Sequence, residues 1–443
     1  MAEATKTESG IMKKKWYAAI LAVSMLIASA CQAAPDGKND PSDTQTAGEQ
    51  ETVSTENGIQ QEAGLEVAAA PLTDYVSDEA MALADCWQSC DDSALAKVMR
   101  KAAAGQPVTI ACIGGSITQG TIAKGTSDDT VGFSRPYADI FREWWETQFP
   151  DTEITFVNAG IGGTDSYLGV HRLKRDVLSQ KPDLVLVEYA VNDADSLFYK
   201  RSYDNLLRNI LEAENAPAVM LLFMEQTNGT SAQGNQVLVG FNYALPMISY
   251  ANCIEYMMEN EQYTAQQLSG DGVHPSALGH AITGELLWRY LDQVYEQRND
   301  FAEPGVFEIA AVTDARYANA DIADRTTVTP EELGTFREQD TGEYFPNGWI
   351  CEEGDGGLTV TLRFRNLGIL YLATVDGKSG SFDIWIDGER VRSINADFAG
   401  GWGNAVTAAE VYTSDEEAGH TVTIKKTEGT EKELFWLLGF LIS

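Results

Sequence analysis

The 443-residue chain is poor in basic residues and in histidine. It holds 31 Lys and Arg residues against 66 Asp and Glu residues, for a formal net charge of -35, and it has only four histidines. Nucleic acid and anionic lipid are themselves negatively charged, so this excess of acidic residues excludes binding of either by electrostatic attraction. Neutral or cationic partners are favoured, and no nucleic-acid partner is expected.

The chain also lacks a metal-binding pattern. His274 and His280 are separated by a proline and do not have the i, i+4 spacing of a helical zinc site. We therefore predict no metal site and expect no cofactor.

No apolar run at the N-terminal end is long enough to span a bilayer. Residues 16–27 are apolar, whereas a spanning helix needs about 20 such residues. Three lysines precede this run and Ala28-Ser29-Ala30-Cys31 follows it, which makes residues 1–31 typical of a signal segment. The small residues before Cys31 resemble a bacterial lipobox, although Ala28 stands where leucine is usual.

Lipidation of Cys31 would anchor the protein as a lipoprotein at the extracellular face of a bacterial cell membrane. The same residues also satisfy the Ala-x-Ala rule for simple cleavage, so secretion stays open. Residues 32–77 are acidic and almost free of large apolar side chains. They predict a disordered linker, because such a segment buries too little surface to offset its ordering entropy.

Six cysteines are few for a secreted chain of this length. If Cys31 is lipidated, five remain, and at least one thiol stays unpaired in a monomer. Cys112 falls in a predicted strand, where we expect it to be buried. Cys86 and Cys90 lie four positions apart on a predicted helix, and we favour two thiols on one helix face over a disulfide between them.

An apolar strand runs directly into a glycine-flanked serine within residues 110–120. Gly114 and Gly115 permit a sharp turn, which leaves the side chain of Ser116 exposed at the carboxyl edge of a sheet. Such a serine is a candidate nucleophile. Gly-Gly-Ser also occurs at ordinary strand-to-helix turns with serine as the N-cap, so this segment does not decide the matter alone.

Asp271 and His274 supply a candidate base for that serine. A histidine three positions after an aspartate can accept the Ser116 proton while the aspartate holds the other ring nitrogen. The alternative is that Asp271 caps the next helix and His274 lies on the surface. The competing histidines, His171 and His280, fall inside predicted helices.

Two further predicted strands end in possible donors to an oxyanion. The strand at 154–157 leads into a glycine-rich loop, and the strand at 184–188 leads to Asn192. A glycine N–H and an asparagine amide at adjacent strand ends can both point at the carbonyl oxygen that Ser116 attacks. Glycine and asparagine are also common loop formers, so either segment alone is weak evidence.

Together and in this order, the four segments resemble the SGNH/GDSL hydrolase superfamily over residues 84–299. The resemblance implies that Ser116 is the nucleophile, in Gly-Gly-Ser-Ile-Thr where the family has Gly-Asp-Ser-Leu, a variant similar to the family's carbohydrate esterases. It also maps the family's Asp-x-x-His block onto Asp271 and His274.

The resemblance further implies an oxyanion hole made by the N–H groups of Ser116 and Gly163 and by the Asn192 amide. Gly160 and Gly162 are alternatives to Gly163, because they lie close to it in the loop. Alanine replaces the family's glycine two positions before Asn192.

The hydrophobic pattern independently predicts an α/β fold. Apolar runs alternate with segments of helical period, which favours a parallel sheet covered on both faces, with a site at the strands' carboxyl ends. The expected strands are 108–113, 154–157, 184–188, 218–224 and 245–249, and the expected helices are 136–148, 167–179, 203–214 and 278–295. For residues 78–300, the resemblance implies a flavodoxin-like three-layer sandwich with a five-stranded parallel sheet.

Residues 301–443 predict a second, all-β sandwich domain that resembles the jelly-roll carbohydrate-binding modules of polysaccharide esterases. The expected strands are 358–365, 368–373, 381–386, 390–394, 420–426 and 433–442. Its aromatic residues are candidates for stacking on sugars or for core packing: Tyr344, Phe345, Trp349, Phe398 and Trp402. We select Trp349 and Trp402 as candidate substrate-binding residues.

These observations favour a serine esterase that removes short acyl groups, chiefly O-acetyl, from a polysaccharide or oligosaccharide at the cell surface. Acetylated carbohydrate is the expected partner, and the membrane is a partner only through the lipid anchor. A lipase or lysophospholipase with the same residues, and a thioesterase, remain as alternatives. A surface glycan-binding lipoprotein with a decayed hydrolase domain is the non-enzymatic alternative.

Overall fold

The computed structural model describes residues 75–443 except 86–89, 128–130, 132–133 and 306–309. The expected signal segment with Cys31, most of the expected linker, and Cys86 lie outside the described residues. Lipidation of Cys31 therefore remains a prediction. The expected placement of Cys90 on a helix is wrong, because Cys90 lies in the segment between the helices Asp78–Ala84 and Ser93–Ala103. The described residues belong to one compact unit, Ala68–Ser443.

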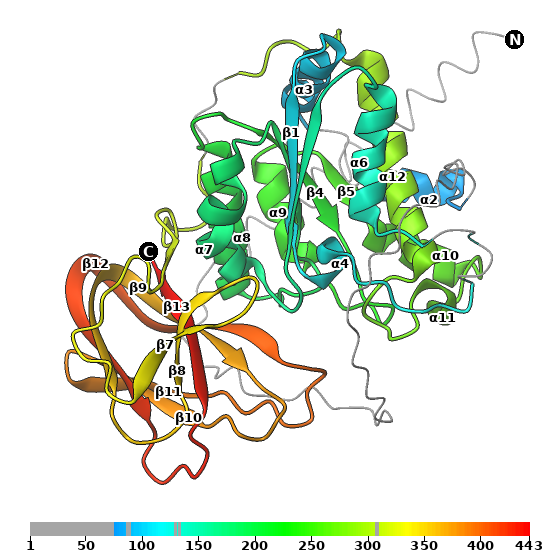
Figure 1. The fold of residues 1–443 in the computed structure, drawn as a ribbon. Coiled ribbons are helices and arrows are strands. Elements are labelled where there is room, and N and C mark those ends of the chain that lie inside the picture. The colour runs from blue at the N-terminus through cyan, green and yellow to red at the C-terminus, as the bar shows by residue number, and fades with distance from the viewer. Residues whose placement is uncertain (1–74, 86–89, 128–130, 132–133, 306–309) are drawn as a thin grey trace, which may run out of the picture. The chain divides into compact units, whose positions relative to one another are not determined.

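A five-stranded parallel sheet organises the first domain, which confirms the expected α/β class (Figure 1). The strand order is β2-β1-β3-β4-β5. The strands are β1 Val108–Gly114, β2 Ile154–Gly160, β3 Leu184–Glu188, β4 Ala218–Phe223 and β5 Met247–Ser249. The central strands β3 and β4 are buried along their whole length, because helices cover both faces of the sheet.

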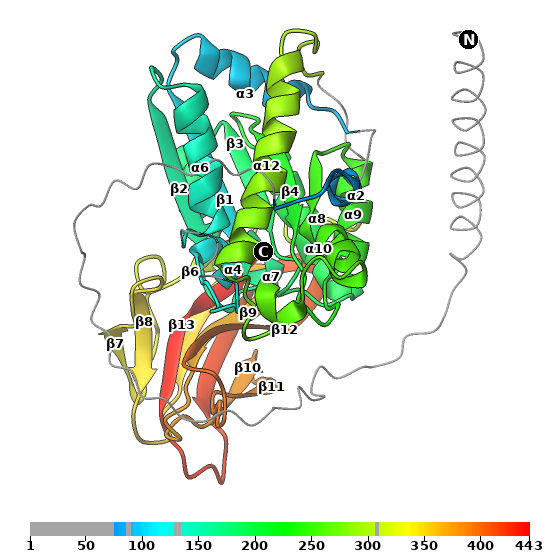
Figure 2. The ribbon, with the colours of Figure 1, turned by 90° about the vertical axis from the view of Figure 1, so that its right-hand side faces the viewer.

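Helices pack on both faces of the sheet and enclose two hydrophobic cores (Figures 1 and 2). One face carries α2 Asp78–Ala84, α3 Ser93–Ala103, α6 Tyr137–Gln148, α10 Tyr250–Glu259 and α12 Ala277–Gln297. The other face carries α7 Ser166–Asp176, α8 Leu197–Leu211 and α9 Gln233–Asn242. Two helices of one turn, α4 Ser116–Gln119 and α11 Ala265–Leu268, complete the described helices of this domain.

Some boundaries differ from the sequence-based expectation for local reasons. Helix α8 begins at Leu197, before the expected residue 203, because the Ser196 side chain caps it by accepting the Tyr199 N–H. Helix α7 ends at Asp176, and a single 3-10 turn, Leu178–Gln180, follows it. Strand β5 begins at Met247 rather than at residue 245, directly after a proline, which cannot donate to a ladder.

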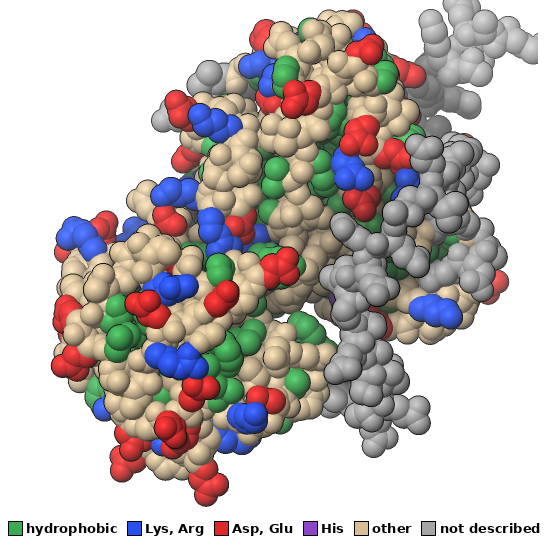
Figure 3. All heavy atoms as spheres, viewed as in Figure 1, with side chains coloured by type: hydrophobic (Ala, Val, Ile, Leu, Met, Phe, Trp, Pro, Cys, Tyr) green, Lys and Arg blue, Asp and Glu red, His purple; other side chains and the backbone are tan. Residues whose placement is uncertain are grey.

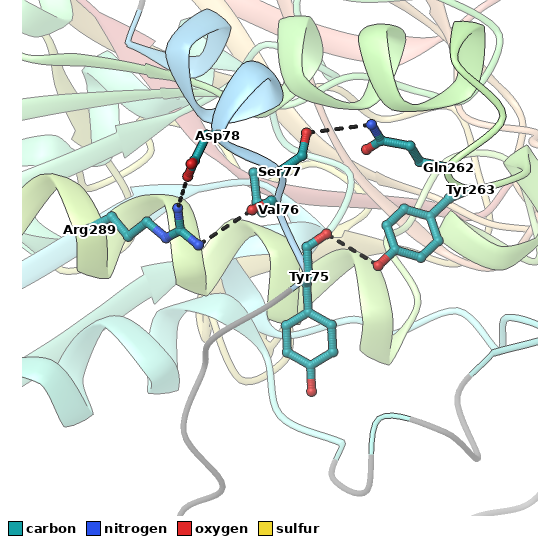
Figure 4. Close-up of a pocket in the computed structure, with 7 residues that line it drawn as sticks. All are labelled: Tyr75, Val76, Ser77, Asp78, Gln262, Tyr263 and Arg289. Atoms are coloured by element: carbon teal, nitrogen blue, oxygen red, sulfur yellow. Dashed lines mark hydrogen bonds and ion pairs between the residues drawn. The ribbon is translucent and has the colours of Figure 1, made fainter.

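The chain enters this domain along α12 (Figure 4). The side chain of Glu285 accepts the backbone N–H groups of Tyr75 and Val76, and Arg289 donates to the Val76 carbonyl. The hollow between these elements is lined by Tyr75, Val76, Ser77, Asp78, Gln262, Tyr263 and Arg289. None of the predicted site residues lines this hollow. We interpret it as the place where residues 75–78 are held against α12.

The second domain is an antiparallel β-sandwich-like domain, which confirms the expected all-β class. Its strands are β6 Asp321–Ala323, β7 Phe336–Asp340, β8 Asn347–Cys351, β9 Leu358–Ala373, β10 Ser381–Ile386, β11 Glu389–Asn395, β12 Ala405–Lys426 and β13 Phe435–Ile442. Their order is β11-β10-β12-β9-β13-β8-β7, and β6 also pairs with β13. The two strands expected at 358–365 and 368–373 are one long strand, β9.

The two domains share a hydrophobic core. Leu370 of β9 and Leu438 and Leu441 of β13 pack with the side chains of α7 and α8. The second half of β9 is therefore covered on both faces, whereas its first half alternates between buried and exposed positions. That change in pattern explains why the sequence suggested two strands.

The surface carries both signs of charge. Figure 3 shows Asp and Glu side chains spread over the viewed face and interspersed with Lys and Arg. In the part of the chain that the structure describes, no helix combines the length and apolar character that crossing a membrane requires.

Candidate active site

The candidate nucleophile stands where β1 turns into α4. Ser116 is the first residue of α4, and Gly114 and Gly115 precede it. A Cβ on Gly114 would lie 2.0 Å from Thr118 Oγ1, and a Cβ on Gly115 would lie 2.3 Å from Asn192 Oδ1. A Cβ on Gly114 would also meet the Glu188 backbone carbonyl, so Gly114 is required for the tight turn that presents Ser116, whereas a larger residue at position 115 would displace the Asn192 side chain.

The structure brings the predicted base and acid to this serine. Nε2 of His274 lies 2.9 Å from Oγ of Ser116, and Nδ1 of His274 lies 2.7 Å from Oδ2 of Asp271. Oδ1 of Asp271 also accepts the backbone N–H groups of Val273 and His274, each at 2.8 Å. The aspartate thus fixes both the imidazole and the short turn that carries it.

The charge of Asp271 is set by these contacts. Partial burial alone would raise its pKa, but the hydrogen bonds from the His274 ring and from the N–H groups of His274 and Val273 outweigh burial and hold the pKa well below its usual range. An ionised Asp271 requires the proton on Nδ1 of His274, which leaves Nε2 as the acceptor for the Ser116 hydroxyl.

The hydrogen bonds of the loop after β2 distinguish among its three glycines. The N–H of Gly160 donates to Asn158 Oδ1 at 2.9 Å, and that of Gly162 donates to Gln119 Oε1 at 2.8 Å. Among the described residues, no acceptor is recorded for the N–H of Gly163, which has a positive φ of 71°. Gly163 is therefore the glycine whose N–H is left for an oxyanion.

Asn192 lies beside the nucleophile turn, against Gly115. Its neighbour Asp193 is buried and holds the loop after β3 in place by accepting the Ser166 N–H and the Gln236 amide, at 2.9 and 3.0 Å. Burial, reinforced by the nearby Asp165, raises the pKa of Asp193 well above its usual range. The sequence pattern did not predict this anchoring role, because the role depends on contacts with two other helices.

A second buried carboxyl lies behind the nucleophile. Glu188 ends β3 with no exposed surface, and its Oε2 accepts the Thr118 hydroxyl at 3.0 Å, while Thr118 Oγ1 lies 2.7 Å from the Tyr137 hydroxyl. Burial raises the pKa of Glu188 to about 7, against the lowering effect of the Thr118 hydrogen bond. The sequence-based prediction missed this residue, although a glutamate at the end of an otherwise apolar strand was a signal that could have found it.

The competing histidines are engaged elsewhere. His171 is buried, with Nδ1 2.8 Å from the Tyr167 carbonyl. His280 is buried between the Tyr137 N–H and the Thr121 carbonyl, at 3.0 and 3.1 Å. Burial lowers the pKa of each imidazole to about 4, so both stay neutral within the folded protein at ordinary pH.

The predicted stacking residues of the β domain divide into two groups. Trp402 is 71% exposed, and its ring atoms lie 3.1 Å from the position of a Cβ on Gly163, so it stands at the site. Tyr344 is also exposed and lies at the same rim, where its hydroxyl contacts Gln119. Phe398 packs edge-on against Trp402, with ring centroids 6.1 Å apart.

The selection of Trp349 as a stacking residue is wrong. Trp349 is fully buried in the β-domain core, with its ring 6.1 Å from that of Phe440, so it presents no face to a sugar. Phe345 is buried as well and lies under the Arg175 guanidinium. The sequence pattern did not reveal which face of β8 turns inward, because that depends on pairing with β13 and β7.

Among the described residues, the other thiols and carboxylates form no metal site and no activated nucleophile. In the described ranges, no group of three or more His, Cys, Asp or Glu side chains is arranged to hold a metal ion. Cys112 is buried in β1, as expected, and burial raises the pKa of its thiol. Cys90 is a free thiol whose pKa burial raises to about 12.

The fold and the geometry of this site are those expected of a GDSL-like acylhydrolase domain. Residues 112–282 match the family described as GDSL-like Lipase/Acylhydrolase family. The chain therefore carries a GDSL-like acylhydrolase domain followed by an all-β domain, and it is a carboxylic ester hydrolase. The resemblance inferred from the sequence blocks is confirmed.

Two solved structures resemble the chain across both domains. They are crystal structures of a two-domain esterase, CEX, active on acetylated mannans, and one was co-crystallised with mannopentaose. Each has a TM-score of 0.72 and 27% sequence identity, and the similarity covers 80% of this chain and 95% or 96% of the other. No curated protein matches the chain.

Proposed function

We propose that this protein is a serine esterase that removes O-acetyl groups from a mannan-type polysaccharide. The observation that carries the chemistry is the chain of hydrogen bonds from Ser116 through His274 to Asp271. The N–H of Gly163, which has no acceptor among the described residues, supports it. The likeness to a two-domain esterase active on acetylated mannans supports the substrate class, because it extends over both domains.

Acyl transfer begins with attack of Ser116 Oγ on the ester carbonyl carbon. The hydroxyl proton passes to Nε2 of His274 as the new C–O bond forms, and ionised Asp271 stabilises the resulting imidazolium. The N–H groups of Ser116 and Gly163 and the Asn192 amide hold the oxyanion. Preorganised donors of this kind lower the barrier because they need no reorganisation when the charge develops.

The intermediate collapses when His274 returns its proton to the departing sugar oxygen. The acetyl group then remains on Ser116 as an ester. Water, deprotonated by His274, attacks this ester through a second tetrahedral intermediate, and the C–O bond to Ser116 breaks with return of the proton to its oxygen. Acetate leaves, and every step uses groups of this chain and water alone.

Trp402 supplies a surface for the carbohydrate. Its exposed indole stands next to Gly163, so a sugar ring bearing the acetyl group can stack on it while the ester reaches Ser116. The β domain thereby contributes to polymer binding at the catalytic centre itself. The location at the cell surface rests on residues 1–31 alone and is part of the proposal.

The test compares acetate release from acetylated mannan, from chemically deacetylated mannan and from p-nitrophenyl esters of acetyl and palmitoyl groups. We expect acetate from the acetylated polymer, a preference for the acetyl over the palmitoyl ester, and no activity above background in Ser116→Ala. Preference for the palmitoyl ester with no acetate from mannan would instead establish a lipase, and the proposal would be wrong.

A further inference from the structure

Two side chains of the β domain act on the loop that carries the oxyanion glycine, Tyr344 through Gln119 of α4 and Trp402 by direct contact. Tyr344, in the turn between β7 and β8, accepts a hydrogen bond from the Gln119 Nε2 group at 2.6 Å. The Oε1 atom of the same Gln119 amide accepts the N–H of Gly162 at 2.8 Å. The ring of Trp402, from the turn before β12, lies against Gly163.

These contacts restrain the loop on both sides of the peptide between Gly162 and Gly163. Gln119 holds the N–H of Gly162, and Trp402 lies against the α-carbon of Gly163. The peptide between Gly162 and Gly163, whose N–H is left for the oxyanion, lies between these two contacts. Two consecutive glycines have more backbone freedom than any other pair, so this peptide needs restraint from outside the loop.

Gln119 cannot provide that restraint reliably alone. Its side chain is exposed, and fixing a free glutamine side chain costs conformational entropy. The contact with Tyr344 fixes the position of the amide, and the Gly162 N–H selects the orientation that turns Oε1 toward it. The reverse orientation would bring the NH2 group against the Gly162 N–H, two donors with no acceptor between them.

We propose that the β domain is part of the catalytic centre, because Tyr344 acts through Gln119 as a positioning residue for the oxyanion peptide Gly162–Gly163. The inference rests on the proposed role of Gly163 but not on the identity of the polysaccharide. It gives the β domain a function in the chemical step, separate from the binding of a polymer.

The two roles predict different kinetics. A residue that only binds polymer affects KM for the polysaccharide and leaves a small ester untouched. A residue that positions the oxyanion donor affects kcat for every ester, because each ester passes through the same oxyanion. p-Nitrophenyl acetate is therefore the informative substrate, since it is too small to use a polymer-binding surface.

The experiment measures kcat and KM on p-nitrophenyl acetate for Tyr344→Phe, Gln119→Leu and the double variant. Tyr344→Phe removes one hydroxyl, and we expect kcat to fall about fivefold, the effect of one hydrogen bond, with KM unchanged. Gln119→Leu removes both contacts at similar volume, and we expect a fall of about tenfold or more. The double variant should match Gln119→Leu, because Tyr344 acts only through Gln119.

Tyr317→Phe is the matched control. The Tyr317 hydroxyl likewise makes one side-chain hydrogen bond, which it donates to Glu410 of β12 at 2.7 Å, but Glu410 has no contact with the oxyanion loop among the described residues. We expect its kcat to equal that of the wild type, and circular dichroism and thermal unfolding should show that all variants are folded.

Three outcomes would overturn the inference. They are an unchanged kcat in Tyr344→Phe, additive losses in the double variant, and an effect of Tyr344→Phe confined to KM on acetylated mannan, which would make Tyr344 a substrate contact. Failure of the proposed substrate is separate, because a different polysaccharide would leave all the p-nitrophenyl acetate results in place. Loss of the p-nitrophenyl acetate activity in Ser116→Ala verifies that the assay reports on this site.

Discussion

Nε2 of His274 lies 2.9 Å from Oγ of Ser116, although the two residues are 158 positions apart in the chain. The distance is that of a hydrogen bond between a hydroxyl and a ring nitrogen. The serine is held by the turn after β1, and the histidine by the short turn that Asp271 stabilises before α12. Proton transfer needs both turns in place, so the groups that hold these turns matter as much as the groups that react.

Replacement of Ser116 by alanine tests the nucleophile. We expect kcat on p-nitrophenyl acetate to fall by on the order of 10⁴ or more, because only binding and oxyanion stabilisation would remain. Thermal unfolding should stay close to the wild type, since the side chain is small and partly exposed. Activity above a tenth of the wild type would show that another group attacks the ester.

Replacement of Asn192 by alanine tests the oxyanion hole. Loss of one preorganised donor should lower kcat by about 10²–10³ with little change in KM, because the donor acts mainly on the charge that develops in the transition state. Steady-state kinetics on the acetyl ester measure both constants. A raised KM with an unchanged kcat would instead identify Asn192 as a contact to the ground-state substrate.

Because His171 is buried, we expect the free energy of unfolding to decrease on acidification. Its pKa falls from 6.5 to about 4 on burial, so the unfolded chain binds a proton between these pH values and the folded chain does not. Stability therefore falls as the pH drops through this window, by about 1 kcal/mol between pH 6.5 and 5.5 for one such group. Urea unfolding at the two pH values should show a smaller difference in His171→Phe than in the wild type, and an equal difference would contradict the assignment.

Glu188 should make the stability of the folded protein depend on pH in the opposite direction. Burial raises its pKa from 4.5 to about 7, so between these values the folded chain holds a proton that the unfolded chain has lost. Stability then falls as the pH rises from 4.5 to 7 and is level above that range. Glu188→Gln keeps an acceptor for the Thr118 hydroxyl and removes the titration, so its unfolding free energy should decline less over this window. A decline as steep as that of the wild type would show that other groups cause it.

Trp402 and Trp349 form a matched pair of tests. Trp402→Ala should raise KM on acetylated mannan at least tenfold with a smaller effect on p-nitrophenyl acetate, because an exposed stacking surface acts on the polymer. Trp349→Ala should instead lower the unfolding free energy by about 3–5 kcal/mol, the usual cost of a large cavity. Thermal unfolding of both variants separates the two effects, and a stable Trp349→Ala that loses only polymer activity would reverse the assignment.

The sequence by itself determined the parallel α/β domain, the all-β domain and the residues proposed to carry the chemistry. The apolar runs at β1, β3 and β4 are buried on both faces, which is the pattern of a parallel sheet. The Asp271–His274 pair is local, because the two residues lie three positions apart in one turn. Contacts between residues that are close in the chain can be predicted from the sequence pattern alone.

Only the tertiary structure showed which of several candidate residues of the same type belongs to the site. Gly163 differs from Gly160 and Gly162 because Asn158 and Gln119 occupy the N–H groups of those two. Trp402 differs from Trp349 because pairing of β8 with β13 turns Trp349 into the core. The contact of Asn158 with Gly160 is local, because both residues lie in β2. Gln119 lies in α4 and the partner of β8 is β13, so these two environments do not exist until the chain has packed.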